Sequence, residues 1–375
     1  MVKTAVRLTL IAVSLFVISI SCHAQINPPP KPPETDVPQD AVKTFIEEVR
    51  IPIVAKDANG RFDPTVELSD LMVRENGVVQ PLKSVFRMPA SVMLVLDTGG
   101  DLNRAKDARL TRLVAKELLS SLHQEHRVSV MQVNNHVELL QPWTSTRAEA
   151  IKSLDQLLPN KHSVLLKGLL AAVEQFREVT PGNSHLILMS DGIDGNGAQP
   201  DLTEAYRALI EANITLHVIS YAWLGVKGTQ PIPTRARVKS AVDPHLIDAL
   251  PSTRHPGDPT PDLKTMMKNK GGTLLDIDLL FRKNIKGEMA ERAEEFLVLT
   301  EETGGNLSLP GSGDAMISEA HEIATDINSQ YVMSYKPVQP FNASVNGEYR
   351  KVEVISRRVG LTVRSRRGYV AKAPR

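Results

Sequence analysis

The chain has 375 residues, of which 42% are hydrophobic, so it can fill the core of one large domain or of two ordinary ones. This composition excludes a disordered protein. The 44 lysines and arginines nearly balance the 43 aspartates and glutamates, so the net charge gives no reason to expect a nucleic-acid partner.

The first 24 residues have the pattern of a secretory signal peptide. Lys3 and Arg7 precede an apolar run over residues 8–20, which is shorter than the ~20 residues of a membrane-spanning helix. We therefore expect cleavage after Ala24, no membrane span, and a secreted, periplasmic or cell-envelope location. The single cysteine, Cys22, excludes an intramolecular disulfide. Because the segment ISISC also loosely resembles a bacterial lipoprotein signal, lipidation of Cys22 is the alternative to its removal.

Two β-rich segments are predicted outside the centre of the chain. Residues 25–42 are rich in proline and lack an apolar period, which predicts a linker. Over residues 43–90, alternating apolar residues and the turn signals DANG and ENG predict a run of β-hairpins. Extended segments predict a C-terminal β segment over 330–375, in which the arginines of 355–370 alternate with apolar residues like the solvated face of an edge strand. We expect the two β segments to pack together as a smaller accessory region.

Residues 91–329 show the alternation of strands and helices that is typical of an α/β domain. Continuous apolar runs predict strands at 91–97, 127–134, 185–190 and 214–220, with 137–143 turning back as a hairpin and a short strand at 306–310. Helical spacing predicts helices over 110–122, 145–157, 163–178, 201–213, 287–305 and 314–329. This order favours a doubly wound, mainly parallel sheet with helices on both faces. The periodicity fades over 224–272, which predicts a flexible insertion.

Two aspartates stand at the ends of predicted strands. Asp97 closes the run SVMLVLD and Asp191 follows HLILMS, and both precede short polar turns. In an open α/β sheet, ligands bind beyond the carboxyl ends of the strands, so both carboxylates face one crevice if the two strands are neighbours. A carboxylate that ends a buried strand needs several donors or a cation. Carboxylate and hydroxyl oxygens suit Mg²⁺ or Ca²⁺.

At these residues the sequence resembles the von Willebrand factor type A (VWA) family. The metal-ion-dependent adhesion site of that family reads Asp-x-Ser-x-Ser, completed by a threonine in a middle loop and an aspartate after the fourth strand. The first motif stands here as Asp97-Thr98-Gly99-Gly100-Asp101, Asp191 matches the last aspartate, and Ser163 in KHSVLLKGLLAA stands at the threonine position. The resemblance implies a Rossmann-like VWA fold, the metal residues Asp97, Asp101, Ser163 and Asp191, and a protein partner that presents an acidic residue to the ion.

The resemblance extends from Phe45 to Tyr369, where the order of motifs is similar to that of the VWFA-related proteins of acidobacteria. The sequence departs from the family pattern at both serines of the first motif. Gly99 offers no ligand, and Asp101 makes the site more anionic. This second change favours Ca²⁺ over Mg²⁺, because Ca²⁺ accepts more oxygen ligands in looser geometry.

Three of the four candidates also have a simpler role, whereas the buried strand-end carboxylate of Asp97 is harder to explain without a ligand. Asp101 and Ser163 stand where a residue caps the N-terminus of a helix, and Asp191 is an ordinary turn residue. The sequence has no G-x-G-x-x-G, H-E-x-x-H or G-x-S-x-G motif. We therefore predict an exported, adhesion-type protein-protein interaction module with a degenerate metal site, and not an enzyme.

Two alternatives remain for the function. The first is a metal-independent interaction or scaffold protein of the cell envelope. The second is a metal-dependent phosphohydrolase with Asp97 as nucleophile. A phosphohydrolase of this kind needs a second acidic residue two positions after the nucleophile, and this chain has Gly99 there.

Overall fold

The computed structural model describes residues 48–100, 108–193, 201–222, 224, 288–339 and 347–371. All of them belong to one compact unit, Phe45–Arg375. The expected signal peptide with Cys22, the linker, Asp101 and all of the expected insertion except Leu224 lie outside the described residues. None of the described helices is long and apolar enough to cross a membrane.

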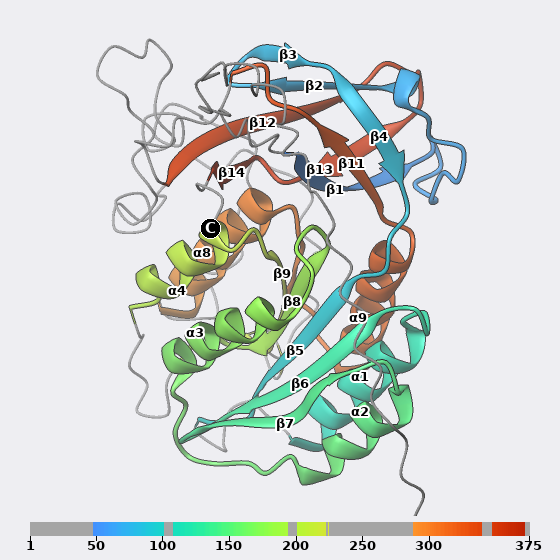
Figure 1. The fold of residues 1–375 in the computed structure, drawn as a ribbon. Coiled ribbons are helices and arrows are strands. Elements are labelled where there is room, and N and C mark those ends of the chain that lie inside the picture. The colour runs from blue at the N-terminus through green and yellow to red at the C-terminus, as the bar shows by residue number, and fades with distance from the viewer. Residues whose placement is uncertain are drawn as a thin grey trace, which may run out of the picture. The chain divides into compact units, whose positions relative to one another are not determined.

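A six-stranded sheet forms the centre of the α/β part, in the order β10-β9-β8-β5-β6-β7 (Figure 1). Its strands are β5 (Ser91–Asp97), β6 (Arg127–Val133), β7 (Val137–Thr144), β8 (Ser184–Ser190), β9 (Thr215–Ser220) and β10 (Leu307–Ser308). β7 returns antiparallel to β6, as predicted, and the other neighbours are parallel. After β7 the chain crosses to β8 on the other side of β5, so the strand order reverses between β5 and β8. A ligand site is expected at the carboxyl ends of these two strands.

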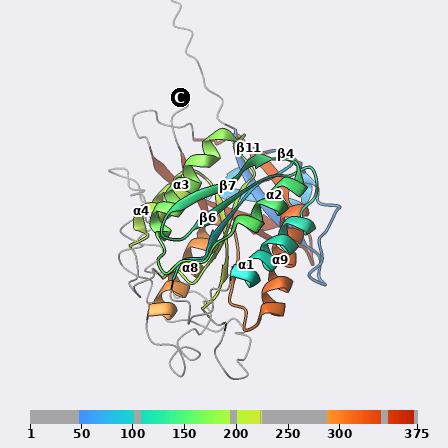
Figure 2. The same ribbon diagram turned by 90° about the horizontal axis from the view of Figure 1, so that it is seen from below.

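Among the described residues, three helices cover each face of this sheet (Figure 2). One face carries α1 (Ala108–Ser121), α2 (Arg147–Ser153) and α9 (Gly313–Asn328), and the other carries α3 (Leu165–Gln175), α4 (Thr203–Glu211) and α8 (Glu288–Thr303). The short 3-10 turns η2 (Leu154–Gln156) and η3 (Phe176–Glu178) extend α2 and α3. Residues of β5 alternate between the two cores, which is why its whole run is apolar. The doubly wound α/β fold is thus confirmed.

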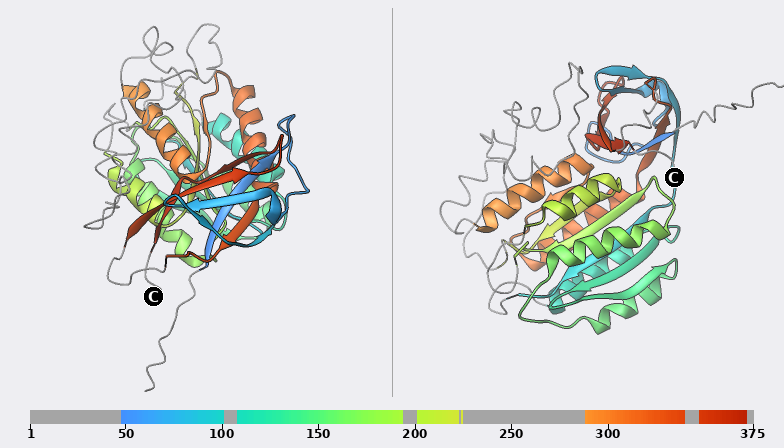
Figure 3. Two further views of the ribbon diagram at one scale, coloured as in Figure 1. Left: turned by 90° about the horizontal axis from the view of Figure 1, so that it is seen from above. Right: turned by 60° about the vertical axis from the view of Figure 1, so that its left-hand side comes forward.

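The N- and C-terminal segments build a separate β region of two antiparallel sheets around a common core (Figure 3). One sheet has the order β13-β1-β11-β4 and the other β14-β12-β2-β3. The strands are β1 (Val49–Lys56), β2 (Leu71–Glu75), β3 (Val78–Gln80), β4 (Leu82–Phe86), β11 (Tyr331–Tyr335), β12 (Glu348–Ser356), β13 (Thr362–Ser365) and β14 (Gly368–Ala371), with the turn η1 (Leu68–Asp70) before β2. The expected accessory β region is therefore present.

The N-terminal part of this region differs from the predicted run of hairpins. β2 and β3 do form a hairpin, and its turn residues Asn76 and Gly77 have φ angles of 48° and 84°, which suit a type I′ turn. β1, however, lies between β11 and β13, and β4 pairs with β11. A buried central strand needs a partner on each side, and here the C-terminal segment supplies both. Local turn signals cannot reveal such distant partners.

The arginines of residues 355–370 do not all lie on the solvated face of an edge strand that we predicted. This segment divides into β13 and β14, which belong to different sheets. Arg366 is only 3% exposed and donates to Asn213 Oδ1 at 2.6 Å, while Arg364 pairs with Asp326 of α9 at 2.7 Å. Arg367 pairs with glutamates at the end of α8. These arginines join the β region to the α/β part, so the interpretation as a solvated face was wrong.

A buried carboxylate links the two sheets of the β region. Glu75 of β2 accepts hydrogen bonds from Tyr335 Oη at 2.7 Å, from Tyr369 Oη at 2.9 Å and from Arg350 Nη1 at 2.9 Å. All four side chains are buried. Because Tyr335 belongs to one sheet and its partners belong to the other, this cluster fixes how the sheets face each other.

We expect Glu75→Ala to lower the free energy of unfolding by about 3–5 kcal/mol, because it leaves the buried Arg350 guanidinium with Glu348 as its remaining carboxylate and removes the acceptor of the Tyr335 and Tyr369 hydroxyls. Glu353 is an exposed residue of β12, so Glu353→Ala is the matched control and is expected to stay within about 0.5 kcal/mol of wild type. Urea denaturation of both variants measures the difference. Equal stability of the two variants would show that the cluster contributes nothing.

Two histidines form a second polar cluster inside the sheet. His185 Nδ1 and His217 Nε2 lie 3.1 Å apart, and His185 Nε2 contacts the side-chain oxygens of Asn183 and Gln330 at 3.0 and 2.7 Å. This pattern requires neutral rings, with each Nε2 donating. Burial lowers the pKa of His185 to about 3, and burial also lowers the pKa of His217 well below its usual value.

This pair predicts acid lability. The unfolded chain takes up protons on these rings near pH 6.5, whereas the folded chain excludes them until far lower pH, so stability is lost as the pH falls from about 6.5 towards 3. Lowering the pH from 7 to 5 is expected to reduce the free energy of unfolding by about 2 kcal/mol for each of these two rings. His217→Asn should reduce this pH dependence, and His136→Asn, at an exposed ring, should leave it unchanged. The free energy of unfolding is measured by urea denaturation at pH 7 and pH 5. An equal change between the two pH values in both variants would contradict the assignment.

Candidate functional site

The Asp97 carboxylate is the centre of the candidate site. It ends β5 with 0% of its surface exposed. Oδ1 accepts hydrogen bonds from Ser163 Oγ at 3.0 Å and from the Gly99 backbone N–H at 3.2 Å, and Oδ2 accepts one from Ser190 Oγ at 2.5 Å. These donors offset the desolvation of the charge. Three chain segments therefore meet at this side chain: the loop after β5, the loop before α3 and the end of β8.

Ser190 is a site residue that our sequence analysis missed. β5 and β8 are neighbours, and their register pairs Leu96 with Met189, so the next positions, Asp97 and Ser190, lie side by side. The Ser190 hydroxyl also accepts the Gly192 N–H at 2.9 Å. The signal available in the sequence was a polar residue closing an otherwise apolar strand, one position before the aspartate that we singled out.

Asp191 lies at the same edge of the sheet and is 7% exposed. Its Oδ1 accepts the Ile193 N–H at 3.0 Å, across a turn in which Gly192 has a φ of 79°. The simpler turn role is thus present in the structure. A side chain at Gly192 would collide with Arg292 of α8, whose Cγ lies 2.1 Å from where a Cβ would stand. The turn after β8 is therefore fixed by its own hydrogen bonds and by close packing.

The loop before α3 places Ser163 beside Asp97. The N-cap of α3 is Val164, without a side-chain capping bond, so the simpler capping role of Ser163 is not the one observed. The loop is held against the strand ends, because the Leu158 carbonyl accepts the Thr98 hydroxyl at 2.9 Å and Asn160 N–H donates to the Thr98 carbonyl at 3.1 Å. The Ser163 hydroxyl thus points at Asp97 from a rigid backbone.

Gly99 explains why the first serine of the family motif is missing. A Cβ at this position would stand 1.9 Å from the His162 carbonyl oxygen and 2.9 Å from the Asn134 Cα. No side chain fits there while the loop keeps its place. The carbonyl oxygen of His162 occupies the space that a serine side chain would enter.

We expect Gly99→Ser, which restores the family residue, to destabilise the protein by about 1–3 kcal/mol, because the His162 carbonyl must move. A Cβ added at Gly311 would meet no atom within 4 Å, so Gly311→Ser is the control and should change stability by less than about 0.5 kcal/mol. Denaturant unfolding compares the two. A Gly99→Ser protein as stable as the control would mean that the loop yields easily.

The potential metal ligands at this edge of the sheet are all oxygens: the Asp97 and Asp191 carboxylates, the Ser163 hydroxyl and the His162 carbonyl. This set fits a hard divalent cation such as Mg²⁺ or Ca²⁺, and it lacks the nitrogen and sulfur ligands that zinc and copper prefer. The fourth expected metal residue, Asp101, lies outside the described residues.

A second group of potential ligands, His123, Glu125 and His126, lies in the turn between α1 and β6. Its buried ring is already engaged. His126 Nδ1 accepts the Ala90 N–H at 2.9 Å, so Nε2 carries the proton, which faces Asn328 Oδ1 at 3.1 Å. A neutral imidazole has one acceptor nitrogen, and this one is taken. The group is therefore a poor metal site.

Residues 91–243 match the model of the von Willebrand factor type A domain. A search of curated proteins finds no significant match. Many solved structures are similar, among them the three that follow. The first, von Willebrand factor type A from Catenulispora acidiphila, has 11% identity over 87% of this chain and 74% of that chain, with a TM-score of 0.42. BatB from Bacteroides thetaiotaomicron has 14% identity over 63% and 98%, with a TM-score of 0.37. The vWF domain of the type V pili tip protein Mfa5 from Porphyromonas gingivalis has 18% identity over 43% and 49%, with a TM-score of 0.28.

Proposed function

Because residues 91–243 of this chain form a von Willebrand factor type A domain, we propose that the chain is an exported protein-interaction module that binds its partner at the carboxyl edge of the central sheet. The observation that carries the proposal is the convergence of two loops and the end of β8 on the buried Asp97 carboxylate. Loops that are already ordered lose little conformational entropy when a partner binds, so more of the contact energy appears as affinity.

A divalent cation is the second part of the proposal. Ser163 would be the hydroxyl ligand, the His162 carbonyl would supply an oxygen where the family has its first serine, and Asp97 and Asp191 would act largely through waters. When bound, the ion offers an open coordination position that an acidic side chain of a partner protein fills. Asp101 in place of the second serine adds negative charge, which favours Ca²⁺.

Binding is favoured over catalysis by the state of Asp97. A nucleophilic carboxylate must reach the phosphorus atom of its substrate, whereas both oxygens of Asp97 accept hydrogen bonds and none of its surface is exposed. Such a residue acts better as an anchor than as a nucleophile. A metal-independent interaction module is the remaining alternative, and chelation separates it from our proposal.

The location of the protein is proposed from its first residues. Residues 1–24 have the charged, apolar and small-residue order of a signal peptide, which supports secretion or release into the periplasm. Lipidation of Cys22 would instead tether the chain to the cell envelope. In the lipidated case the proline-rich residues 25–42 would separate the interaction module from the membrane.

Calorimetric titration of residues 25–375 with Mg²⁺ and Ca²⁺ tests the cation. We expect saturable binding that Ser163→Ala weakens by about tenfold or more, because the variant loses a hydroxyl ligand. Ser163→Thr keeps the hydroxyl and restores the family residue, so it is the matched control and should bind within about threefold of wild type.

Two results would contradict the cation. One is the absence of saturable binding to the folded wild-type chain at millimolar ion concentrations. The other is equal affinity of the Ser163→Ala and Ser163→Thr variants. Either result would leave the metal-independent interaction module as the function to pursue.

A further inference from the structure

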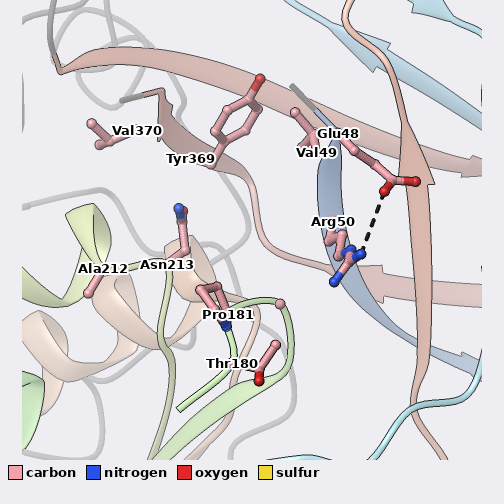
Figure 4. A pocket seen from close by; sticks show the side chains of 10 residues that line it. Glu48, Val49, Arg50, Thr180, Pro181, Ala212, Asn213, Tyr369 and Val370 are labelled. Carbon is pink, nitrogen blue, oxygen red and sulfur yellow. Dashed lines mark ion pairs between the residues drawn. The ribbon is translucent and has the colours of Figure 1, made fainter. Parts of the chain in front are cut away.

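A cavity of about 410 Å³ lies where the β region meets the α/β part (Figure 4). Its walls come from the start of β1, the loop before β8, the segment after α4, and β14. This places it at the amino ends of β8 and β9, the opposite edge of the sheet from Asp97. The size falls in the range of small-ligand pockets. Nothing in the proposed interaction function uses it.

One wall of the cavity is cationic. Arg50 has 39% of its side chain exposed, and it pairs with Glu48 at 3.6 Å, a long distance for an ion pair (Figure 4). Glu48 also pairs with Lys83 at 3.2 Å, so two cations share one carboxylate. A hydrogen bond from Ser334 lowers the pKa of Glu48 and keeps it charged. Arg50, Lys83 and Glu48 together carry a net positive charge, and Arg50 is the cation of the three that lines the cavity and can accept an anion.

The Arg50 side chain is held in place by the loop before β8. Gly182 has a φ of 124°, and a Cβ there would stand 3.1 Å from Arg50 Cδ. Glycine at this position thus lets the aliphatic part of Arg50 lie against the loop. A guanidinium held in this way loses less entropy when it binds a carboxylate, and its planar fork matches both carboxylate oxygens.

The wall opposite Arg50 carries Asn213 (Figure 4). Asn213 Oδ1 accepts a hydrogen bond from the buried Arg366 at 2.6 Å. This bond fixes the orientation of the amide, so its Nδ2 is the donor available to a ligand carbonyl. The exposed apolar residues of the lining are Pro181 and Ala212.

We propose that this cavity binds the C-terminal residue of a peptide that ends in an apolar side chain. Arg50 binds the terminal carboxylate, Asn213 Nδ2 donates to the carbonyl oxygen of the preceding residue, and the apolar side chain packs on Pro181 and Ala212. The site is independent of the Asp97 edge, so the two proposals can fail separately.

The probe is N-acetyl-L-leucine, titrated into residues 25–375 with the methyl NMR signals of Val49, Ala212 and Val370 as the readout. We expect saturable shifts with a Kd on the order of 1 mM, as for a ligand of this size. N-acetyl-L-leucinamide lacks the carboxylate and should bind at least about tenfold more weakly. 4-Methylpentanoate keeps the carboxylate and the apolar side chain but lacks the acetylamino group. It should bind about threefold to tenfold more weakly, because Asn213 then has no carbonyl to contact.

Arg50→Gln should weaken binding of N-acetyl-L-leucine by about tenfold or more. Asn213→Gly, which tolerates the φ of 58° at this position, should weaken it by about threefold to tenfold. Arg61→Gln removes another exposed arginine that pairs with a nearby acid, and it should leave binding unchanged. The proposal is overturned by absence of saturable shifts in the wild-type chain or by undiminished binding to Arg50→Gln. Equal binding of 4-methylpentanoate would assign the cavity to free acids instead of peptide termini.

Discussion

A buried carboxylate at the end of the central strand is the constraint on which the candidate site depends. Asp97 has no exposed surface, so the protein must supply donors for its charge. Ser163 lies in the loop before α3 and Ser190 ends β8, and both reach the same carboxylate. The strand order reverses at this point, which leaves room above the sheet for the loops to converge. The hydrogen bonds that stabilise the Asp97 charge therefore also order the carboxyl edge of the central sheet.

The β region adds a second constraint, because its strands come from both ends of the folded chain. β1 is completed only by β11 and β13, which follow the whole α/β part in the sequence. Ion pairs from the buried Asp326 carboxylate to the partly exposed Lys56 and Arg364 then tie α9 to this region. Because the carboxylate is buried, it depends on these cations, and the contacts also specify how the two parts are joined. The cavity beside Arg50 is a product of that junction.

Much of the fold could be predicted from the sequence, because apolar runs and helical spacing are local signals. The strand that ends at Asp97 and the helix after Ser163 were found in this way, and the order of motifs pointed to the VWA family. Distant pairings carry no local signal, so the partners of β1 and the burial of Arg366 were not foreseen. Ser190 was missed because its role depends on the register of β5 and β8. The likeness to the VWFA-related proteins of acidobacteria, the signal peptide and the metal residues stay predictions.

The central claim is that the Asp97 edge holds a divalent cation through oxygen ligands. Its most direct test is a crystal structure of residues 25–375 grown with Mn²⁺, which is a hard cation and scatters anomalously. We predict an anomalous peak within coordinating distance of the Ser163 hydroxyl and the His162 carbonyl oxygen, with Asp97 still bonded to Ser190. The claim would be contradicted if these loops were ordered in the conformation described here and no such peak appeared. Asp97 would then be a purely structural anchor.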